Sequence, residues 1–416
     1  MKMRDVLSRL NRDRQGSAAV HGVSRWIAAA VLPLVLFAQV SDRARRLHED
    51  AFVFDAHVHM INRQFHDGTD MGQRLKGGQV DLVRAKEGGI DAMFFSLFIP
   101  EQYYPPRYES EHAFRLMDKA LEQIRRNEDK IAIARNGADM DRIRKQGKIA
   151  AVLDLEGGFN LDGDIKVLER LYRMGLRSAQ LPAHNWANNF ADSCCAKPKW
   201  NGLNAKGAEV VAAMNRLGMM INVSHAADAT IEQVLKISVD PILATHHGMR
   251  ALNNIPRNMP DDLMRKIAAK GGVIGFQIGN EFHNRKAFDW RTSHAGKPFW
   301  DTTAIGEKER KLKIEEVDKL VAPTFPMMGM NMPDEILFTP EQWIEVIERA
   351  ISIVGEDHVM LGSDFDGGPT PPRGMHDISD TPQLTEAMLR RGWSEQRIRK
   401  FLGENLLRVF KQVCKK

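Results

Sequence analysis

Short apolar runs that end on a histidine or an acid recur along this chain, with helix-like segments between them. Runs of this length and composition are typical of buried parallel strands. In parallel α/β folds the chemistry collects at the carboxyl ends of the strands, so these polar residues are expected to meet at one edge. The runs are Phe52–His59, Ile149–Glu156, Ser178–His184, Met220–His225, Pro241–His246 and His358–Asp364.

Two further apolar runs, Ala92–Phe98 and Gly272–Ile278, bring the expected strands to eight. Strand alternating with helix eight times predicts a closed (β/α)8 TIM barrel. An open doubly wound sheet is the alternative, although no glycine-rich phosphate turn follows the first run. The segments with helical periodicity are Val80–Glu87, His112–Arg126, Asp164–Met174, Ala205–Leu217, Asp228–Ile237, Asp261–Ala269 and Pro340–Val354.

The domain organisation expected from the 416 residues is a leader over residues 1–40 followed by one barrel domain over residues 41–416. A polar segment at about 280–338 interrupts the pattern after the seventh strand. It is expected to be a lid over the barrel mouth or a plain surface excursion. A last helix, from Ser394 to Val413, is expected to pack outside the barrel.

The leader has the layout of a secretory signal or a short membrane anchor. Residues 1–25 carry six basic and two acidic side chains, a net charge of +4, and Trp26–Ala38 is uncharged and apolar. This apolar run is shorter than the ~20 residues of a spanning helix, and Pro33 interrupts it. We predict an exported, periplasmic or membrane-tethered protein. The alternatives are a cytoplasmic protein with a packed leader helix or a misplaced start codon.

Charge and cysteine content exclude some classes of partner and framework. The formal charge of +5 resides almost wholly in the leader, so a nucleic-acid surface is not expected. Cys194 and Cys195 are adjacent and therefore ill-suited to pair with each other, and Cys414 lies near the end of the chain. Three such cysteines form neither a disulfide framework nor a zinc-finger spacing.

Histidines and one glutamate at the strand ends form a candidate metal site. His57 and His59 are two apart on one strand, so their side chains point to the same side, with Asp55 as a candidate second-layer partner. Glu156 follows an apolar strand, and an unpaired buried carboxylate there would need a cation or donors. Such a glutamate could bridge two metals about 3.5–4 Å apart. Hydrogen-bonded core residues are the alternative interpretation.

Two more histidines end successive strands, a placement that suits a second metal ion. These are His225 and His246, which adjacent strands would bring side by side. His247 competes with His246, but adjacent strand residues point opposite ways, and His246 directly follows the apolar run. Taken singly, each histidine is more often a core residue than a ligand.

Three further residues could act on a substrate. Asp364 ends the eighth strand, where it could take a proton from a metal-bound water and pass it to a leaving amine. Asp366 is expected to cap the following turn. His184 opens a polar loop within reach of a substrate, and Arg257 could grip a carboxylate with two parallel hydrogen bonds. A surface arginine is the plainer interpretation of Arg257.

Together these motifs resemble the renal-type membrane dipeptidases, peptidase family M19 of the amidohydrolase superfamily. The resemblance runs from about Asp55 to Val409. The matching motifs are Asp55–His57, Leu155–Gly158, Ala183–Asn185 with Ala191–Ser193, Val223–His225, Thr245–His246, Arg257–Asp262, Gly362–Gly367 and Asn405–Phe410.

The resemblance implies a barrel of the metal-dependent amidohydrolase type with a binuclear zinc site. One Zn²⁺ would take His57, position 59 and Asp364; the other would take His225 and His246, with Glu156 bridging. It further implies three substrate roles. His184 would polarise the scissile carbonyl, Arg257 would bind the terminal carboxylate of the dipeptide, and Asp364 would shuttle the proton.

One position departs from the family pattern, which usually has His-x-Asp on the first strand. Here the second residue is His59, which makes the site one charge more positive than a carboxylate would. The leading hypothesis is a zinc-dependent dipeptidase that hydrolyses small dipeptides through a metal-bridging hydroxide. The alternatives are another binuclear amidohydrolase, acting on cyclic amides, lactones or N-acyl amino acids, and a non-catalytic binding or maturation barrel. The sequence leaves open whether the chain forms a homodimer.

Overall fold

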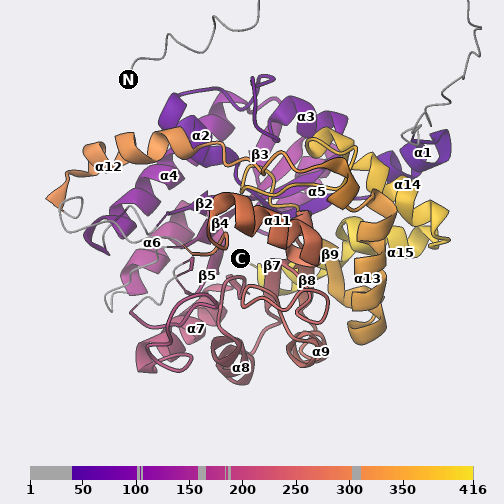
Figure 1. Ribbon diagram of the computed structural model, residues 1–416. Coiled ribbons are helices and arrows are strands. Elements are labelled where there is room, and N and C mark those ends of the chain that lie inside the picture. The colour runs from indigo at the N-terminus through magenta and orange to yellow at the C-terminus, as the bar shows by residue number, and fades with distance from the viewer. Residues whose placement is uncertain are drawn as a thin grey trace, which may run out of the picture. The chain divides into compact units, whose positions relative to one another are not determined.

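The computed structural model describes residues 40–100, 104, 106–157, 165–182, 184–185, 189–301 and 311–415. Most of the predicted leader, residues 1–39, lies outside this part. Residues Val40–Lys416 form one compact unit around a parallel sheet (Figure 1). The sheet has the order β1-β2-β4-β5-β6-β7-β8-β9. Its strands are β1 Phe54–Val58, β2 Ala92–Phe98, β4 Ile149–Glu156, β5 Leu176–Gln180, β6 Met220–Asn222, β7 Leu243–His247, β8 Val273–Phe276 and β9 Val359–Leu361.

The sheet closes on itself, which confirms the predicted barrel. A parallel bridge joins Val58 to Phe365, just beyond β9. Two hydrogen bonds hold this seam, one from the Asp364 N–H to the His57 carbonyl at 2.9 Å and one from the His59 N–H to the Phe365 carbonyl at 2.9 Å. Closure therefore brings the first and last candidate ligands together. A short extra strand, β3 (Ile131–Ile133), pairs with β4 outside the barrel order and was not predicted.

Helices surround the strands in Figure 1. Four of the seven predicted helices, α7, α8, α9 and α13, have the bounds expected from their periodicity. Helix α13 begins with a capping box on Thr339 and a proline in its first turn, which explains its sharp start. The helices are α1 Asp42–Asp50, α2 Met60–Asp67, α3 Leu82–Glu87, α4 Pro106–Arg126, α5 Gly137–Lys145, α6 Ile165–Met174, α7 Ala205–Leu217, α8 Asp228–Ile237, α9 Asp261–Ala269, α10 Asn280–His283, α11 Arg285–Ala295, α12 Ile314–Val321, α13 Pro340–Val354, α14 Pro382–Arg390, α15 Glu395–Arg399 and α16 Asn405–Val413.

The barrel interior has an apolar layer below a polar one. Side chains alternate along a strand, so Val152, Asp154 and Glu156 of β4 share one face. Val152 belongs to a core cluster that also contains Phe54 and, from α16, Phe410. Helix α16 thus packs against one end of the barrel, with Leu406, Val409, Phe410 and Val413 in the same cluster.

Several strands end before the residue that was expected to terminate them. Strand β5 ends at Gln180, β6 at Asn222 and β9 at Leu361, so His184, His225 and Asp364 lie on the turns that follow. A turn can bend its side chain over the barrel mouth, which a straight strand cannot do. The expectation that each run is a strand to its last residue is therefore wrong, although each residue stays at the carboxyl edge.

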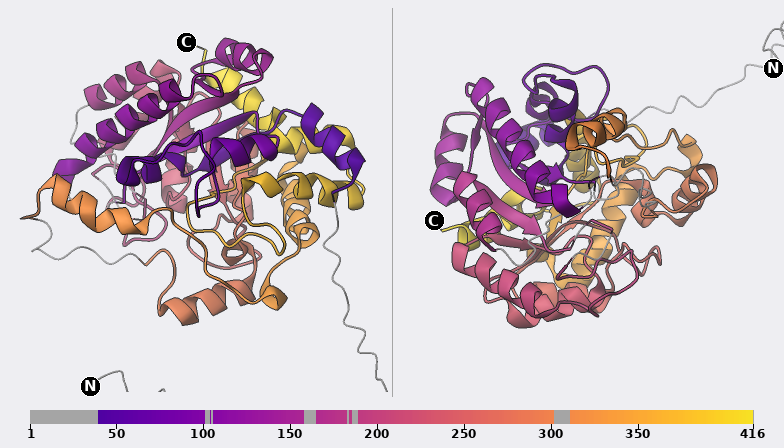
Figure 2. Two further views of the ribbon diagram at one scale, coloured as in Figure 1. Left: turned by 90° about the horizontal axis from the view of Figure 1, so that it is seen from above. Right: turned by 90° about the vertical axis from the view of Figure 1, so that its left-hand side faces the viewer.

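The polar segment after β8 contains helices α10, α11 and α12. In Figure 1, α11 lies just above the labels β7 and β8, and Figure 2 shows the same segment on one side of the barrel. Among the described residues, none of the helices combines the length and the apolar character needed to cross a bilayer.

Buried His48 joins α1 to α14, and the two helices lie side by side in Figures 1 and 2. Its Nδ1 lies 2.7 Å from Thr385 Oγ1 and its Nε2 lies 2.8 Å from the Gly88 carbonyl oxygen. Burial lowers the pKa of His48 to about 4, and the hydrogen bond to Gly88 only partly opposes this. The folded chain therefore keeps this ring neutral at pH values where the unfolded chain protonates it.

We expect the free energy of unfolding to fall as the pH falls from 6.5 to 4, because only the unfolded state gains a proton on His48 in that window. The contribution of this residue is about 3 kcal/mol over the whole window and is fully present above pH 6.5. Urea unfolding at pH 7 and pH 4.5 should show a shallower pH dependence in His48→Gln than in the unchanged protein. Parallel pH dependences would contradict this account.

Candidate metal centre and substrate cavity

Glu156 lies at the centre of the polar layer, between two pairs of histidines. Its Oε2 is 2.8 Å from His57 Nε2 and 3.1 Å from His59 Nε2. Its Oε1 is 3.1 Å from His225 Nε2 and 3.6 Å from His246 Nε2. Each oxygen of this carboxylate thus faces a different pair of histidines. The structure brings all four predicted histidines together around it.

Asp364 completes the first cluster. Its Oδ1 is 3.0 Å from His59 Nε2 and 3.8 Å from His57 Nε2. The backbone at Asp364 has a φ of 63°, a conformation that non-glycine residues seldom adopt. The next turn needs Gly367, because a Cβ there would lie 1.9 Å from Asp364 Oδ1. This close approach lets the backbone pass directly beside the carboxylate.

The electrostatics of the cluster fit a cation. Burial alone would lower the pKa of His59, but the carboxylates of Glu156 and Asp364 outweigh burial and raise it to about 10. The two acids therefore favour positive charge at this point. Within the described residues, candidate ligand atoms lie within 4.8 Å of one another in three overlapping groups. The groups are His57–His246–Asp364, His57–His59–Glu156 and Glu156–His184–His225.

The orientation of the imidazoles also fits metal ligation. His225 Nε2 and His246 Nε2 lie 3.0 Å apart, and His57 Nε2 and His59 Nε2 lie 3.2 Å apart. His225 Nδ1 lies 3.1 Å from Asn185 Oδ1, so Nδ1 donates and Nε2 presents its lone pair to the cluster. Nitrogen and carboxylate ligands in this number suit zinc and other divalent first-row metals. The residues present thus fit the implied metal pair.

A second layer of polar groups orients these ligands, and the sequence interpretation missed it. Asn185 holds His225, Thr245 Oγ1 lies 2.9 Å from His246 Nδ1, and Ser96 Oγ donates to Glu156 Oε2 at 2.6 Å. Gln277 Nε2 donates to Asp364 Oδ2 at 3.0 Å. Such groups fix ring orientation and raise ligand basicity. A signal existed for Ser96, since it is a polar residue inside an otherwise apolar strand.

The carboxylate that faces the His57 ring is not that of Asp55, the predicted partner. Asp55 Oδ1 accepts hydrogen bonds from the backbone N–H groups of His57 and Ser363. It therefore holds the strand backbone in place and does not orient the His57 ring. The carboxylate facing the ring is Asp154, whose Oδ2 lies 3.8 Å from His57 Nδ1. Burial raises the pKa of Asp154 to about 7, although His57 opposes the rise. Asp154 shares a strand face with Glu156, which sequence periodicity could have revealed.

His184 reaches the same cluster from the loop after β5. Its Nε2 is 3.7 Å from Glu156 Oε1, and its ring lies 3.9 Å from the His225 ring. Burial lowers the pKa of His184 to about 4, and nearby Glu156 only partly opposes this. The ring is therefore neutral at pH 7, so it can donate a hydrogen bond to a carbonyl oxygen without carrying a charge.

Arg257 is a buried guanidinium, not a surface arginine. Its side chain is 1% exposed, and its Nη2 donates to the His246 carbonyl at 3.2 Å. Within the described residues its Nε and Nη1 have no hydrogen-bond partner. Burial lowers its pKa to about 10, so it stays charged at pH 7. A buried cation with two unused donors points to an anionic ligand.

The two adjacent cysteines, which lie beside the backbone of His225, do not behave as expected from the sequence. Cys194 and Cys195 are joined by a disulfide, although their adjacency was taken to disfavour pairing. The Cys194 N–H donates to the His225 carbonyl at 2.7 Å, and His225 has a φ of 65°. The loop thus supports the backbone of a candidate ligand. His247 is buried too, but neither of its ring nitrogens has a side-chain partner among the described residues.

These groups open into a cavity of about 370 Å³, a volume suited to a small substrate. His59, Glu156, His184, Asp364 and Arg257 are among the residues that line it. The part of the predicted insertion that reaches the cavity includes Arg291, Phe299 and Met327–Met328. The insertion therefore contributes side chains to the lining of the cavity.

Residues 41–416 match the family model described as membrane dipeptidase (peptidase family M19). The chain is 27% identical over 386 residues to the dipeptidase verJ of Clonostachys rogersoniana, covering 89% of this chain and 86% of that protein. It is 28% identical over 372 residues to the dipeptidase tcpJ of Claviceps purpurea, covering 86% of this chain and 75% of that protein.

Among solved structures, the chain is similar to the probable dipeptidase PvdM from Pseudomonas aeruginosa. The TM-score is 0.72 at 25% sequence identity, and the match covers 90% of this chain and 98% of that chain. The match therefore takes in the barrel together with the segments around its mouth.

Proposed function

The chain belongs to the membrane dipeptidase family, peptidase family M19, and is a metal-dependent dipeptidase; we propose that its metal is a pair of zinc ions and its substrate a small dipeptide. The observation that carries the proposal is the position of Glu156. Each of its two oxygens faces a separate pair of histidine nitrogens, at distances between 2.8 and 3.6 Å. A bridging carboxylate of this kind is what a two-metal site requires.

His57, His59 and Asp364 would hold one ion, and His225 and His246 would hold the other. When bound, such a pair would supply the Lewis acidity that activates a water molecule for attack on an amide carbonyl at neutral pH. Asp364 would take the proton of the attacking water and deliver it to the leaving amine. Gln277 would keep the second oxygen of that carboxylate in place through its hydrogen bond to Oδ2.

His184 and Arg257 would orient the substrate. A neutral His184 would donate a hydrogen bond to the carbonyl oxygen as negative charge develops on it. The free donors of Arg257 would bind the carboxylate at the end of the dipeptide. The distance between this guanidinium and the Glu156 cluster would restrict substrates to dipeptides, because a longer chain places its carboxylate out of reach.

We expect the purified protein loaded with zinc to hydrolyse Ala-Ala and other simple dipeptides, and to lose this activity in a chelator. The assay should include N-acyl amino acids, cyclic amides and lactones, the substrates of the rival amidohydrolase interpretation. Activity on those compounds with none on any dipeptide would overturn the proposal. Fewer than one bound ion per chain, with no hydrolysis of any kind, would favour a binding barrel.

The leader adds a proposal about location. The basic residues 1–25 and the apolar Trp26–Ala38 support export or membrane tethering of this family member. N-terminal sequencing of the protein isolated from its own cells tests this. A mature chain recovered from the cytoplasm with an intact leader would contradict it.

A further inference from the structure

The cavity carries a second arginine that the proposed chemistry does not use. Outside the ligand cluster, the charged side chains among the described residues that line the cavity are Arg257 and Arg291. Arg291 lies on α11, within the segment inserted after β8. Its side chain is 19% exposed and belongs to the lining of the cavity.

The two arginines belong to one continuous wall. The Arg257 guanidinium carbon lies 5.5 Å from the centre of the Phe282 ring, and that of Arg291 lies 5.0 Å from the centre of the Phe299 ring. The two rings are in contact, with centres 4.9 Å apart. The wall therefore has an arginine at each end and two aromatic rings between them, the surface that a short peptide with two anionic groups would fit.

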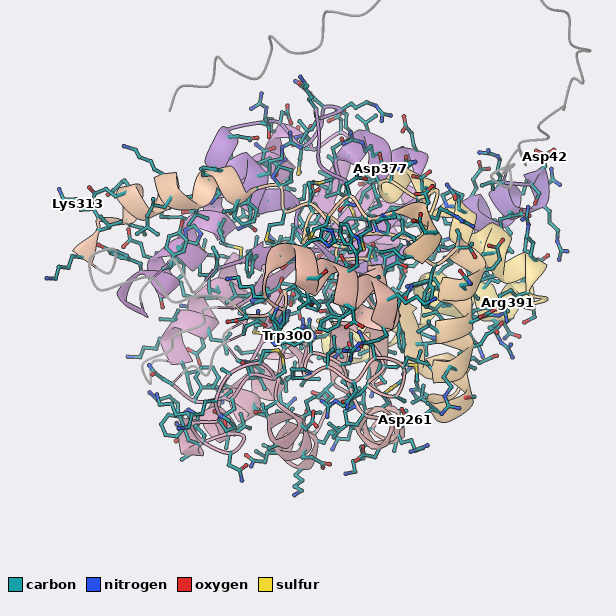
Figure 3. The ribbon with its side chains drawn as sticks, in the orientation of Figure 1. Asp42, Asp261, Trp300, Lys313, Asp377 and Arg391 are labelled. Carbon is teal, nitrogen blue, oxygen red and sulfur yellow. A yellow bond between two sulfur atoms is a disulfide. The ribbon has the colours of Figure 1, made fainter. Side chains whose placement is uncertain are left out.

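This wall is held firmly in place. Trp300, the neighbour of Phe299, stacks on Phe288 of α11 with ring centres 5.4 Å apart, and Figure 3 labels Trp300 beside that helix. Arg291 itself is positioned by Glu281, whose Oε1 lies 3.2 Å from Nη1. The guanidinium is therefore presented to the cavity in one orientation.

The ion pair with Glu281 does not use all the hydrogen-bond donors of the Arg291 guanidinium. Fully buried Glu281 also accepts hydrogen bonds from Thr370, from Oγ1 at 2.7 Å and from the backbone N–H at 3.3 Å. Among the described residues, the hydrogen bonds of Arg291 start from Nη1 alone, to Glu281 and to the Gly368 carbonyl. Its Nε and Nη2 donors remain available for a carboxylate.

We propose that Arg291 binds a side-chain carboxylate of the substrate, so that the enzyme prefers dipeptides containing aspartate or glutamate. This inference rests on the proposed function, because it assigns Arg257 to the terminal carboxylate and Arg291 to the second one. A carboxylate beside a half-buried guanidinium gains charge-assisted hydrogen bonds that the neutral amide of the same shape lacks.

The test compares kcat/KM for each acidic dipeptide with its neutral amide: Ala-Glu with Ala-Gln, Ala-Asp with Ala-Asn, and the same pairs in reversed order. We expect the acidic member to be preferred about tenfold or more in at least one order. The order that shows the preference identifies which substrate residue faces Arg291. Equal or lower values for the acidic member in both orders would overturn the inference.

Variants separate recognition from structural support. Arg291→Met should bring the acid-to-amide ratio close to one, and Arg291→Lys should retain part of it. Arg285→Met, which removes an exposed arginine paired with Asp289 on the same helix, should keep the ratio. If Arg291→Met fails to fold with Glu281 unpaired, E281Q/R291M removes both charges together.

A variant that lowers both members of each pair by the same factor would show that Arg291 is only structural, and would overturn the inference. Hydrolysis of Ala-Gln without preference for Ala-Glu would remove this inference and leave the dipeptidase proposal standing. Failure to hydrolyse any dipeptide would remove both.

Discussion

Replacing Asp364 by asparagine should lower kcat by about three orders of magnitude while the protein keeps its metal. Loss of a positioned general acid or base costs between 10² and 10⁴ in rate. Asparagine retains an oxygen that can face the His59 cluster, but it cannot accept a proton at pH 7. Its amide would also place N–H groups against Gln277 Nε2, which now donates to Asp364 Oδ2. Single-turnover hydrolysis of a dipeptide, together with metal analysis, measures both effects.

Asp366→Asn is the matched control for this variant. Asp366 lies two residues further along the same turn, is also buried and also has a positive φ, 62°. Its Oδ1 accepts a hydrogen bond from the Gln79 N–H, which an asparagine oxygen can also accept. We expect this variant to keep its metal and most of its kcat. Full activity in Asp364→Asn would remove Asp364 from the mechanism.

Replacing Glu156 by glutamine should abolish binding of the metal pair and lower kcat/KM by about a thousandfold. The amide removes one negative charge from a buried cluster in which carboxylates attract cations. It also turns an N–H donor toward nitrogens that now face a carboxylate oxygen, for example His57 at 2.8 Å or His225 at 3.1 Å. Metal analysis should give fewer than two ions per chain.

Glu356→Gln provides the control for this loss of charge. Glu356 forms ion pairs with Arg397 and Lys400 away from the cavity, and its side chain is 30% exposed. The same chemical change there should leave two ions per chain and the activity in place. If Glu156→Gln retained two ions and normal turnover, Glu156 would not be the bridge and the binuclear assignment would fail.

Prediction from the sequence succeeded where the signal was local. The helical period of Ala205–Leu217 and of Pro340–Val354 gave the bounds that the structure has. The eight strand candidates all correspond to barrel strands, although the carboxyl ends of β1, β5, β6, β8 and β9 were set too late. The error has one cause: an apolar run continues into the turn, because the mouth of the barrel is buried as thoroughly as its wall.

Prediction failed where the contact joins distant segments. Asn185 supports His225 and Gln277 supports Asp364, each on a different turn, and sequence spacing does not show which ligand such a residue will contact. The pairing of Cys194 with Cys195 depends on the local backbone of a loop, which periodicity does not describe. The sequence did not show which part of the barrel α16 covers, because an amphipathic pattern does not identify the surface it packs against.

The order of the eight barrel strands, and the residue types at their ends, were determined by the sequence alone. Parallel strands separated by helices can close only as a barrel or stack as an open sheet, so polar residues at their ends must meet. Only the tertiary structure decided which oxygen of Glu156 faces which histidine and which ring nitrogen is free. It also decided that Arg291 shares a wall with Arg257. These facts depend on side-chain directions set by packing between segments far apart in the chain, and sequence spacing carries no record of such directions.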